Sequence, residues 1–267
     1  MITVEYLGGW GNKMFQYVFA RLLSEANNIN LNAKCPLPET NIKTFDEPKN
    51  KKGTVTIGDE IFRANNPDSK LLQLDPNYDY IIRGFFQDAD LYNKHVTQIR
   101  EFFDINYPDN LIEKTLVTVR LGDFIWDGDN SEIIHYDYYK KTLSNIEGDV
   151  DVSVGHYQHN DTKSTEEQEA KYLSYFVKDY FNILPPEEDF LKEFNSSFKY
   201  KTMILSNSTW AWWVGFLSKC SNIYTFEKTG WFTPGNHRCH GIHIKNLWNI
   251  RNISKPINED FIDISKM

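Results

Sequence analysis

The sequence predicts an α/β fold divided into two lobes, and three features of the chain support this prediction. Residues 2–7 read as a short strand that runs through a glycine-rich turn into an apolar stripe at helical spacing. Residues 202–217 repeat this step, because a short apolar run is followed by polar residues and then by a Trp-rich helical pattern. Residues 104–110 interrupt the apolar pattern and are typical of a linker. We therefore expect lobes at residues 1–107 and 108–267.

The first lobe is expected to hold further strands and one more helix. Residues 30–76 are polar and contain Pro and Gly, so we expect loops there, with one short strand at about residues 54–57. Residues 80–82 are apolar and read as a buried strand. A helix is expected from about Asp88, with an apolar face that runs to Phe103.

The second lobe is expected to alternate strands and helices in the same way. Its first strand covers residues 115–119 and ends at Arg120. Residues 155–170 are polar and predict a loop, whereas residues 172–184 are compatible with a helix or a strand. Further strands are expected at residues 149–154, 203–205 and 222–226, and helices from about Tyr136, at 187–194 and from Trp210.

Composition and charge argue against several classes of partner. The 267 residues carry a net charge of −8 without a basic cluster, which disfavours nucleic acid and anionic membranes. The three cysteines are odd in number and lack ligand spacing, so we expect a reducing compartment and a cytoplasmic location. We expect no signal peptide before the first strand, and no apolar stretch reaches transmembrane length. An integral membrane segment is therefore not expected, and the sequence makes no prediction of oligomeric state.

Two strand ends in the second lobe are candidate anion-binding sites. Residues 206–209 lie where a strand ends and a helix begins, and free backbone N–H groups there favour an anion. One of these four polar residues is expected to cap the helix. The alternative to an anion site is a simple N-cap, although a cap needs only one of them. Arg120 ends a buried strand, where its planar fork can clamp a phosphate or instead pair with Asp123. In the first lobe, Asn12 stands at the mouth of a helix, where an amide caps the helix or holds a ligand.

Several motifs resemble those of the bacterial α-1,2-fucosyltransferases. Residues 7–17, Leu-Gly-Gly-Trp-Gly-Asn-Lys-Met-Phe-Gln-Tyr, resemble the G-G-L-G-N-Q-M-F-Q-Y opening of that family. Residues 119–124, Val-Arg-Leu-Gly-Asp-Phe, are similar to its H-x-R-R-G-D-Y motif. Residues 206–213, Ser-Asn-Ser-Thr-Trp-Ala-Trp-Trp, are similar to its S-N-S-S/T-F-S-W-W motif. Residues 84–87 and the segment around His135 match further stretches in the same order.

The resemblance implies a GT-B-like architecture, in which two Rossmann-like lobes face a cleft. It also implies transfer of L-fucose from GDP-fucose to a galactose-like hydroxyl of a glycan, with inversion at the anomeric carbon. The expected partners are therefore a nucleotide sugar and a glycan acceptor, and neither a metal nor a cofactor is expected. Residues 1–107 are expected to form the acceptor side, and residues 108–267 to bind the nucleotide sugar.

The resemblance assigns roles to particular residues. Arg120 is expected to hold the β-phosphate of GDP and so to act in catalysis. The candidate bases follow instead from the reaction, which has to remove a proton from the acceptor hydroxyl. They are Asp123 and Asp127, the latter on a polar loop that also carries Asp129. Gln87 and His135 are expected on the acceptor side. The residues expected to bind the donor are Gly9, Gly11, Asn12, Arg120, Ser206, Asn207, Ser208 and Thr209.

Two positions depart from the family pattern. The leading His of the second motif is Thr118 here, and its second Arg is Leu121. One imidazole contact and one cationic contact to the donor are therefore expected to be missing. A site with fewer polar contacts discriminates less sharply, so we expect weaker donor binding and some competition from other GDP-sugars.

Two other classes of function stay open at the level of sequence. One is a glycosyltransferase that uses a metal through Asp-x-Asp, with triplets beginning at Asp88, Asp127 and Asp149. The other is a non-catalytic sugar-binding protein, since the Trp-rich helix and the aromatic tail suit sugar rings. The His and Cys residues at 237–243 lie close together in the sequence, whereas a closed zinc site draws its ligands from two separated pairs. A metal is therefore not expected at this cluster.

Overall fold

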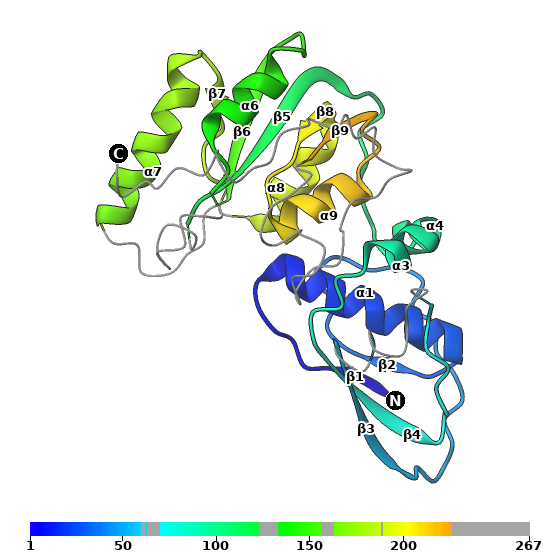
Figure 1. Ribbon diagram of the computed structural model, residues 1–267. Coiled ribbons are helices and arrows are strands. Elements are labelled where there is room, and N and C mark those ends of the chain that lie inside the picture. The colour runs from blue at the N-terminus through cyan, green and yellow to red at the C-terminus, as the bar shows by residue number, and fades with distance from the viewer. Residues whose placement is uncertain (60–61, 63–69, 123–132, 156–162, 188, 226–267) are drawn as a thin grey trace. The chain divides into compact units, whose positions relative to one another are not determined.

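The computed structural model describes residues 1–59, 62, 70–122, 133–155, 163–187 and 189–225 of the 267-residue chain (Figure 1). The chain divides into two compact units, of which unit 1 contains Met1–Ile105 and unit 2 begins at Asn106. Each unit has a parallel β-sheet accompanied by helices, so the predicted α/β class is confirmed. The assignment of the two lobes to acceptor and donor stays a prediction.

Unit 1 is built on a four-stranded sheet with strand order β2-β1-β4-β3, in which all neighbouring strands are parallel. The strands are β1 (Ile2–Val4), β2 (Leu31–Asn32), β3 (Gly53–Gly58) and β4 (Tyr78–Arg83). The helices described in this unit are α1 (Trp10–Asn27), α3 (Ala89–Lys94) and α4 (Val96–Arg100). The strands predicted at residues 54–57 and 80–82 are therefore confirmed as β3 and β4.

The helix predicted from about Asp88 to Phe103 is wrong as a single element. Asp88 caps α3, because its carboxylate accepts a hydrogen bond from the Leu91 N–H at 3.0 Å. His95 then has φ −113° and ψ 16°, outside the helical region, so the hydrogen-bond ladder restarts in α4. The apolar spacing of the sequence continues across this break, and for that reason the pattern does not reveal it.

Unit 2 is built on a five-stranded parallel sheet with strand order β7-β6-β5-β8-β9. The strands are β5 (Ile112–Arg120), β6 (Val150–Gly155), β7 (Asn182–Ile183), β8 (Tyr200–Ile204) and β9 (Asn222–Tyr224). The helices described here are α6 (Tyr136–Leu143), α7 (Lys163–Lys178), α8 (Phe190–Ser196), the short 3-10 helix η2 (Ser197–Lys199) and α9 (Thr209–Leu217). The predicted alternation of strands and helices in this part of the chain is confirmed.

Part of the loop predicted at residues 155–170 is helical, because α7 begins at Lys163. The stretch left open at residues 172–184 divides between the end of α7 and β7. The early turns of α7 carry exposed charged side chains such as Glu166, and its apolar contacts come later, at Phe176. A solvated helical segment lacks the apolar periodicity that identifies a helix in a sequence.

The sheet of unit 2 is wound in two directions from its centre. From β5 the chain moves through β6 to β7 on one side, and from β8 it moves to β9 on the other side. The reversal lies between the neighbouring strands β5 and β8. Because parallel crossovers are right-handed, the two directions place α6 and α9 on opposite faces of the sheet. Ligands of such sheets bind outside the carboxyl ends of the strands at the reversal.

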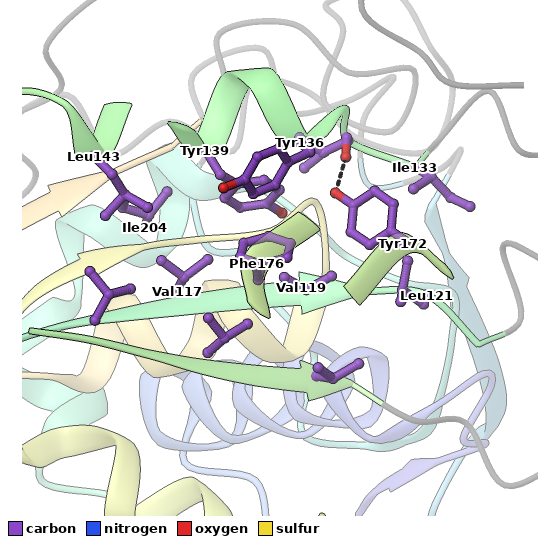
Figure 2. Close-up of a cluster of buried hydrophobic side chains, with 14 residues drawn as sticks. Val117, Val119, Leu121, Ile133, Tyr136, Tyr139, Leu143, Tyr172, Phe176 and Ile204 are labelled. Atoms are coloured by element: carbon purple, nitrogen blue, oxygen red, sulfur yellow. Dashed lines mark hydrogen bonds between the residues drawn. The ribbon is translucent and has the colours of Figure 1, made fainter. Parts of the chain in front are cut away.

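One face of this sheet is closed by α6 and α7 through a cluster of buried apolar side chains (Figure 2). The members that come from β5 and the residue after it are Val117, Val119 and Leu121. Burial of each aliphatic side chain of this kind stabilises the fold by roughly 1.5–3 kcal/mol. Because side chains alternate along a strand, Thr118 and Arg120 face the opposite side of the sheet.

Helix α9 is apolar on every side. The sequence predicts one apolar stripe, but the helix is buried from Ala211 to Leu217. The rings of Trp212 and Phe216 stack with their centroids 4.7 Å apart. A helix that is hydrophobic all round belongs in a protein interior. Among the described residues, no helix has both the length and the apolarity that crossing a membrane would demand.

Candidate functional site

The first candidate site lies at the carboxyl ends of β5 and β8, where the winding of unit 2 reverses. Thr118 Oγ1 accepts a hydrogen bond from the backbone N–H of Ser206 at 2.7 Å. The same hydroxyl lies 3.3 Å from Ser206 Oγ and 3.4 Å from the carbonyl oxygen of Ile204. Thr118 and Ser206 are only 2% and 4% exposed. One buried hydroxyl therefore fixes the chain as it leaves β8, beyond the last paired residues of the two strands.

The polar residues between β8 and α9 have separate roles. Ser208 caps α9, because its side-chain oxygen accepts from the Trp210 N–H at 3.2 Å. The expectation that one of these residues serves as an N-cap is therefore confirmed. Ser206 and Asn207 are buried before the cap, and Thr209 is the first helical residue. These residues lie at the positive end of a helix, an arrangement that favours an anion.

Arg120 is the last residue of β5 and is half-buried. It is paired in register with Gly155, the last residue of β6. A Cβ on Gly155 would lie 3.6 Å from Arg120 Nη1 and 3.7 Å from Arg120 Cδ, so the arginine lies across a bare glycine. At the carboxyl end of β5, Arg120 therefore lies toward β6 and Ser206 lies toward β8.

The turn after Arg120 is held by a residue that sequence reasoning missed. Gly122 has φ +50°, a conformation that favours glycine, and its N–H donates to Glu169 Oε1 at 3.0 Å. Glu169 belongs to α7, within the stretch that the sequence predicts as a loop. This carboxylate therefore fixes the backbone two residues beyond the expected phosphate clamp.

Both departures from the family motif have a structural account. Leu121 is fully buried in the cluster closed by α6 and α7 (Figure 2). An arginine at this position would bring a charge into an apolar interior, at a high cost in free energy. The hydroxyl of Thr118 is engaged with Ser206. Both residues thus have a role within the fold, and the weaker donor binding expected from them stays a prediction.

Of the other residues expected at the active site, some lie outside the described part of the chain and others have a structural role. The candidate bases Asp123 and Asp127 lie outside the described residues, and so does the His and Cys cluster at residues 237–243. The pairing of Arg120 with Asp123 therefore stays a prediction. His135 is the N-cap of α6, since its Nδ1 accepts from the Asp137 N–H at 3.1 Å. Its expected place on the acceptor side stays a prediction as well.

The second candidate site lies in unit 1, after the carboxyl ends of β1 and β4. Gln87 Nε2 donates a hydrogen bond to Asn12 Oδ1 at 2.8 Å. The structure thus joins two residues that the resemblance assigned to different substrates. Gly9 is the N-cap position of α1 and has no side chain to cap with, and Gly11 is buried in the first turn. Gly8 has φ +71°, a conformation that favours glycine.

Gln16 is a further member of this turn that sequence reasoning missed. Its side-chain amide donates to the carbonyl of Leu7 and accepts from the N–H of Leu7, both at 2.8 Å. The side chain of Gln16 is fully buried. A polar amide inside an otherwise apolar helix face is the signal that points to such a role, because buried polar groups need partners.

In each Asp-x-Asp triplet within the described residues, at least one aspartate has structural partners. Asp88 caps α3, while Asp151, which is 5% exposed, accepts from Asn182 Nδ2 at 2.7 Å and from the Tyr200 hydroxyl at 2.8 Å. Burial raises the pKa of Asp151, but the hydrogen bonds from Asn182 and Tyr200 and the nearby Lys114 ammonium together lower it more, so this pKa lies below its usual value. Among the residues that the structure describes, no three His, Cys, Asp or Glu side chains gather as a metal site requires. Metal independence stays a prediction.

Comparison with known proteins gives one informative similarity. No protein-family model matches the chain. The chain is similar to the O-antigen biosynthesis glycosyltransferase WbnK of Escherichia coli, with 25% identity over 288 aligned positions. The match covers 86% of this chain and 94% of that protein. Because it extends over both units, the similarity supports a relationship with glycosyltransferases for the chain as a whole.

Proposed function

We propose that the protein is a glycosyltransferase that moves L-fucose from GDP-fucose to a galactose-like hydroxyl of a glycan. The observation that carries the proposal is the strand-end site of unit 2, where Thr118 holds Ser206 in place and Arg120 ends the same strand. A diphosphate needs hydrogen-bond donors and positive charge, and this position in a doubly wound sheet is where ligands bind. The similarity to an O-antigen biosynthesis glycosyltransferase supports a sugar as the transferred group.

The proposed reaction is a single displacement with inversion. The oxygen of the acceptor hydroxyl attacks the anomeric carbon of fucose while the bond from that carbon to the diphosphate oxygen breaks. The electron pair of that bond leaves with GDP, and the hydroxyl proton passes to a base, for which Asp123 and Asp127 are the candidates. Charge therefore grows on the leaving diphosphate. The Arg120 fork and the N-terminus of α9 would stabilise it most in the transition state.

We also propose a GT-B-like division between the two units. Each unit has its own parallel sheet, and polar residues follow the carboxyl ends of its strands. The edge of unit 2 that carries Arg120 and Ser206 is assigned to GDP. The edge of unit 1 that carries Asn12 and Gln87 is assigned to a contact with the donor or with the acceptor.

Calorimetry with GDP tests the donor half of this proposal. We expect GDP to bind in the presence of a metal chelator and to bind more tightly than UDP. Arg120→Lys should bind GDP more weakly, because a point charge cannot replace a planar fork. Arg83→Lys is the matched control, since the Arg83 side chain is 64% exposed and lies in unit 1. Loss of GDP binding on chelation would contradict the metal-free site, and tighter binding of UDP would contradict the assigned donor.

A further inference from the structure

The turn that follows β4 holds an aromatic residue in a conformation that side-chain-bearing residues rarely adopt. Phe86 has φ +49°, in the left-handed region, and is fully buried. Its ring stacks on that of Phe19, with centroids 4.1 Å apart and planes inclined by 8°. The Tyr92 hydroxyl donates to the Phe86 carbonyl at 2.5 Å. Strained backbone of this kind persists only where the surrounding contacts enforce it, and it is frequent at functional sites.

A carboxylate from the neighbouring strand enforces this turn. Asp59 directly follows β3, and its two oxygens accept from the N–H of Phe85 at 2.5 Å and from the N–H of Phe86 at 2.7 Å. Position 84 has to be glycine, because a Cβ on Gly84 would lie 2.6 Å from Asp59 Oδ2. Since β3 and β4 are parallel neighbours, the end of one strand supplies the group that shapes the turn after the other.

The strained turn brings Gln87 to Asn12. Gln87 is 2% exposed, and its Nε2 donates to Asn12 Oδ1 at 2.8 Å. The Asn12 amide nitrogen lies over Gly8, where a Cβ would approach it to 2.5 Å. Asn12 is half-buried, and its Nδ2 makes no hydrogen bond to any described residue. The carboxamide is therefore held in one orientation and keeps a donor for a ligand.

We propose that Asp59 and Gln87 are positioning residues, which hold the Asn12 carboxamide so that its Nδ2 donates to an oxygen of a substrate. The inference rests on the proposed function for the identity of the substrates. The oxygen belongs to the diphosphate of the donor or to a hydroxyl of the acceptor sugar, and both are hydrogen-bond acceptors. A carboxamide that is fixed in advance binds at a lower entropic cost than one that is free to rotate.

Four variants separate positioning from folding. Gln87→Leu removes the group that orients Asn12, and Asp59→Asn places an amide N–H against the N–H groups of the strained turn. Asn12→Asp keeps an acceptor for Gln87 but removes the Nδ2 donor. The matched control is Gln98→Leu, which removes an amide of the same unit that donates to Glu25 Oε2 at 3.2 Å.

Steady-state kinetics with the donor and the acceptor varied in turn is the first measurement. We expect Gln87→Leu and Asn12→Asp to raise the KM of one substrate about tenfold, as the loss of one hydrogen bond would. The substrate affected identifies the oxygen as that of the diphosphate or that of the acceptor sugar. Gln98→Leu should leave both KM values unchanged. The same KM values in Gln87→Leu and Gln98→Leu would overturn the inference.

The side-chain amide signals of Asn12 in a ¹⁵N NMR spectrum give a second measurement, which needs no turnover. We expect Gln87→Leu and Asp59→Asn to shift these signals and Gln98→Leu to leave them in place. If Gln87→Leu leaves them unchanged, Gln87 does not position Asn12, whichever donor the protein uses. If no nucleotide sugar supports transfer and the signals still shift, the proposed function fails while the positioning role stands.

Discussion

Replacing Thr118 with valine removes the hydroxyl that holds the strand-end site of unit 2 and leaves the side-chain volume nearly unchanged. In Thr118→Val, the buried N–H of Ser206 loses the acceptor that lies 2.7 Å away. A buried donor left without a partner costs about 1–3 kcal/mol. The chain between β8 and α9 then has to shift to find another acceptor, and the residues expected to bind GDP shift with it.

The loss should appear in both stability and ligand affinity. We expect the free energy of unfolding of Thr118→Val to fall by about 1–3 kcal/mol. A shifted loop that forfeits one hydrogen bond to GDP, about 1.4 kcal/mol, weakens binding about tenfold. Thr118→Ser keeps the hydroxyl and loses only a methyl group, about 0.8 kcal/mol of burial, so it should keep its affinity for GDP.

Thr142 provides the matched control for this experiment. It is 4% exposed, and its hydroxyl donates to the carbonyl of Tyr138 at 2.9 Å within α6. Thr142→Val removes a buried hydroxyl of the same unit without leaving a buried N–H unpaired, so it should keep its affinity for GDP. Urea denaturation measures the free energy of unfolding, and calorimetry measures the Kd for GDP. Equal GDP affinities in Thr118→Val and Thr142→Val would refute the idea that Thr118 shapes a binding site.

Three further outcomes follow from the same structure. Arg120→Lys should lose about 2–4 kcal/mol of transition-state stabilisation, measured as kcat/KM with GDP-fucose, and turnover like that of the wild type would contradict the phosphate clamp. Ser208→Ala should lower the free energy of unfolding by about 1 kcal/mol while Ser208→Asn retains it, and equal urea midpoints for the two would exclude the cap. Because the pKa of Asp151 is lowered in the folded state, the ionised carboxylate stabilises the fold at pH values above about 3.9, the ordinary pKa of an aspartate. This stabilisation is lost as the pH falls through the lower pKa of the folded state. The gap in melting temperature between the wild type and Asp151→Asn should therefore shrink with acidification below about pH 5, and a gap that is constant with pH would contradict this.

The local elements of both candidate sites could be predicted from the sequence, but the contacts that assemble them could not. The apolar run before residues 206–209 predicted where β8 ends and α9 begins, because both boundaries depend on residues that are close together in the sequence. Thr118 and Ser206, in contrast, are 88 positions apart, and Asn12 and Gln87 are 75 positions apart. Only the pairing and register of the parallel strands bring such residues together.

Other residues were missed because apolar periodicity does not encode their roles. Glu169 accepts a hydrogen bond from the N–H of Gly122, and it lies in a solvated part of α7. This part of the helix has no apolar stripe by which the sequence would identify it as helical. Asp59 reads as an ordinary loop residue until β3 is placed beside β4. At Leu121 the sequence motif suggested a missing contact to the donor. The alternation of side chains along β5 instead places Leu121 in the hydrophobic core.

A donor screen with the purified protein tests the central proposal most directly. The protein is incubated with a galactoside acceptor and, separately, with GDP-fucose, other GDP-sugars and UDP-sugars, and the linkage of each product is determined by NMR. We predict that GDP-fucose is the best donor and that fucose is attached to a galactose hydroxyl in α-linkage. Transfer from a UDP-sugar, with GDP-fucose left unused, would contradict the proposed function.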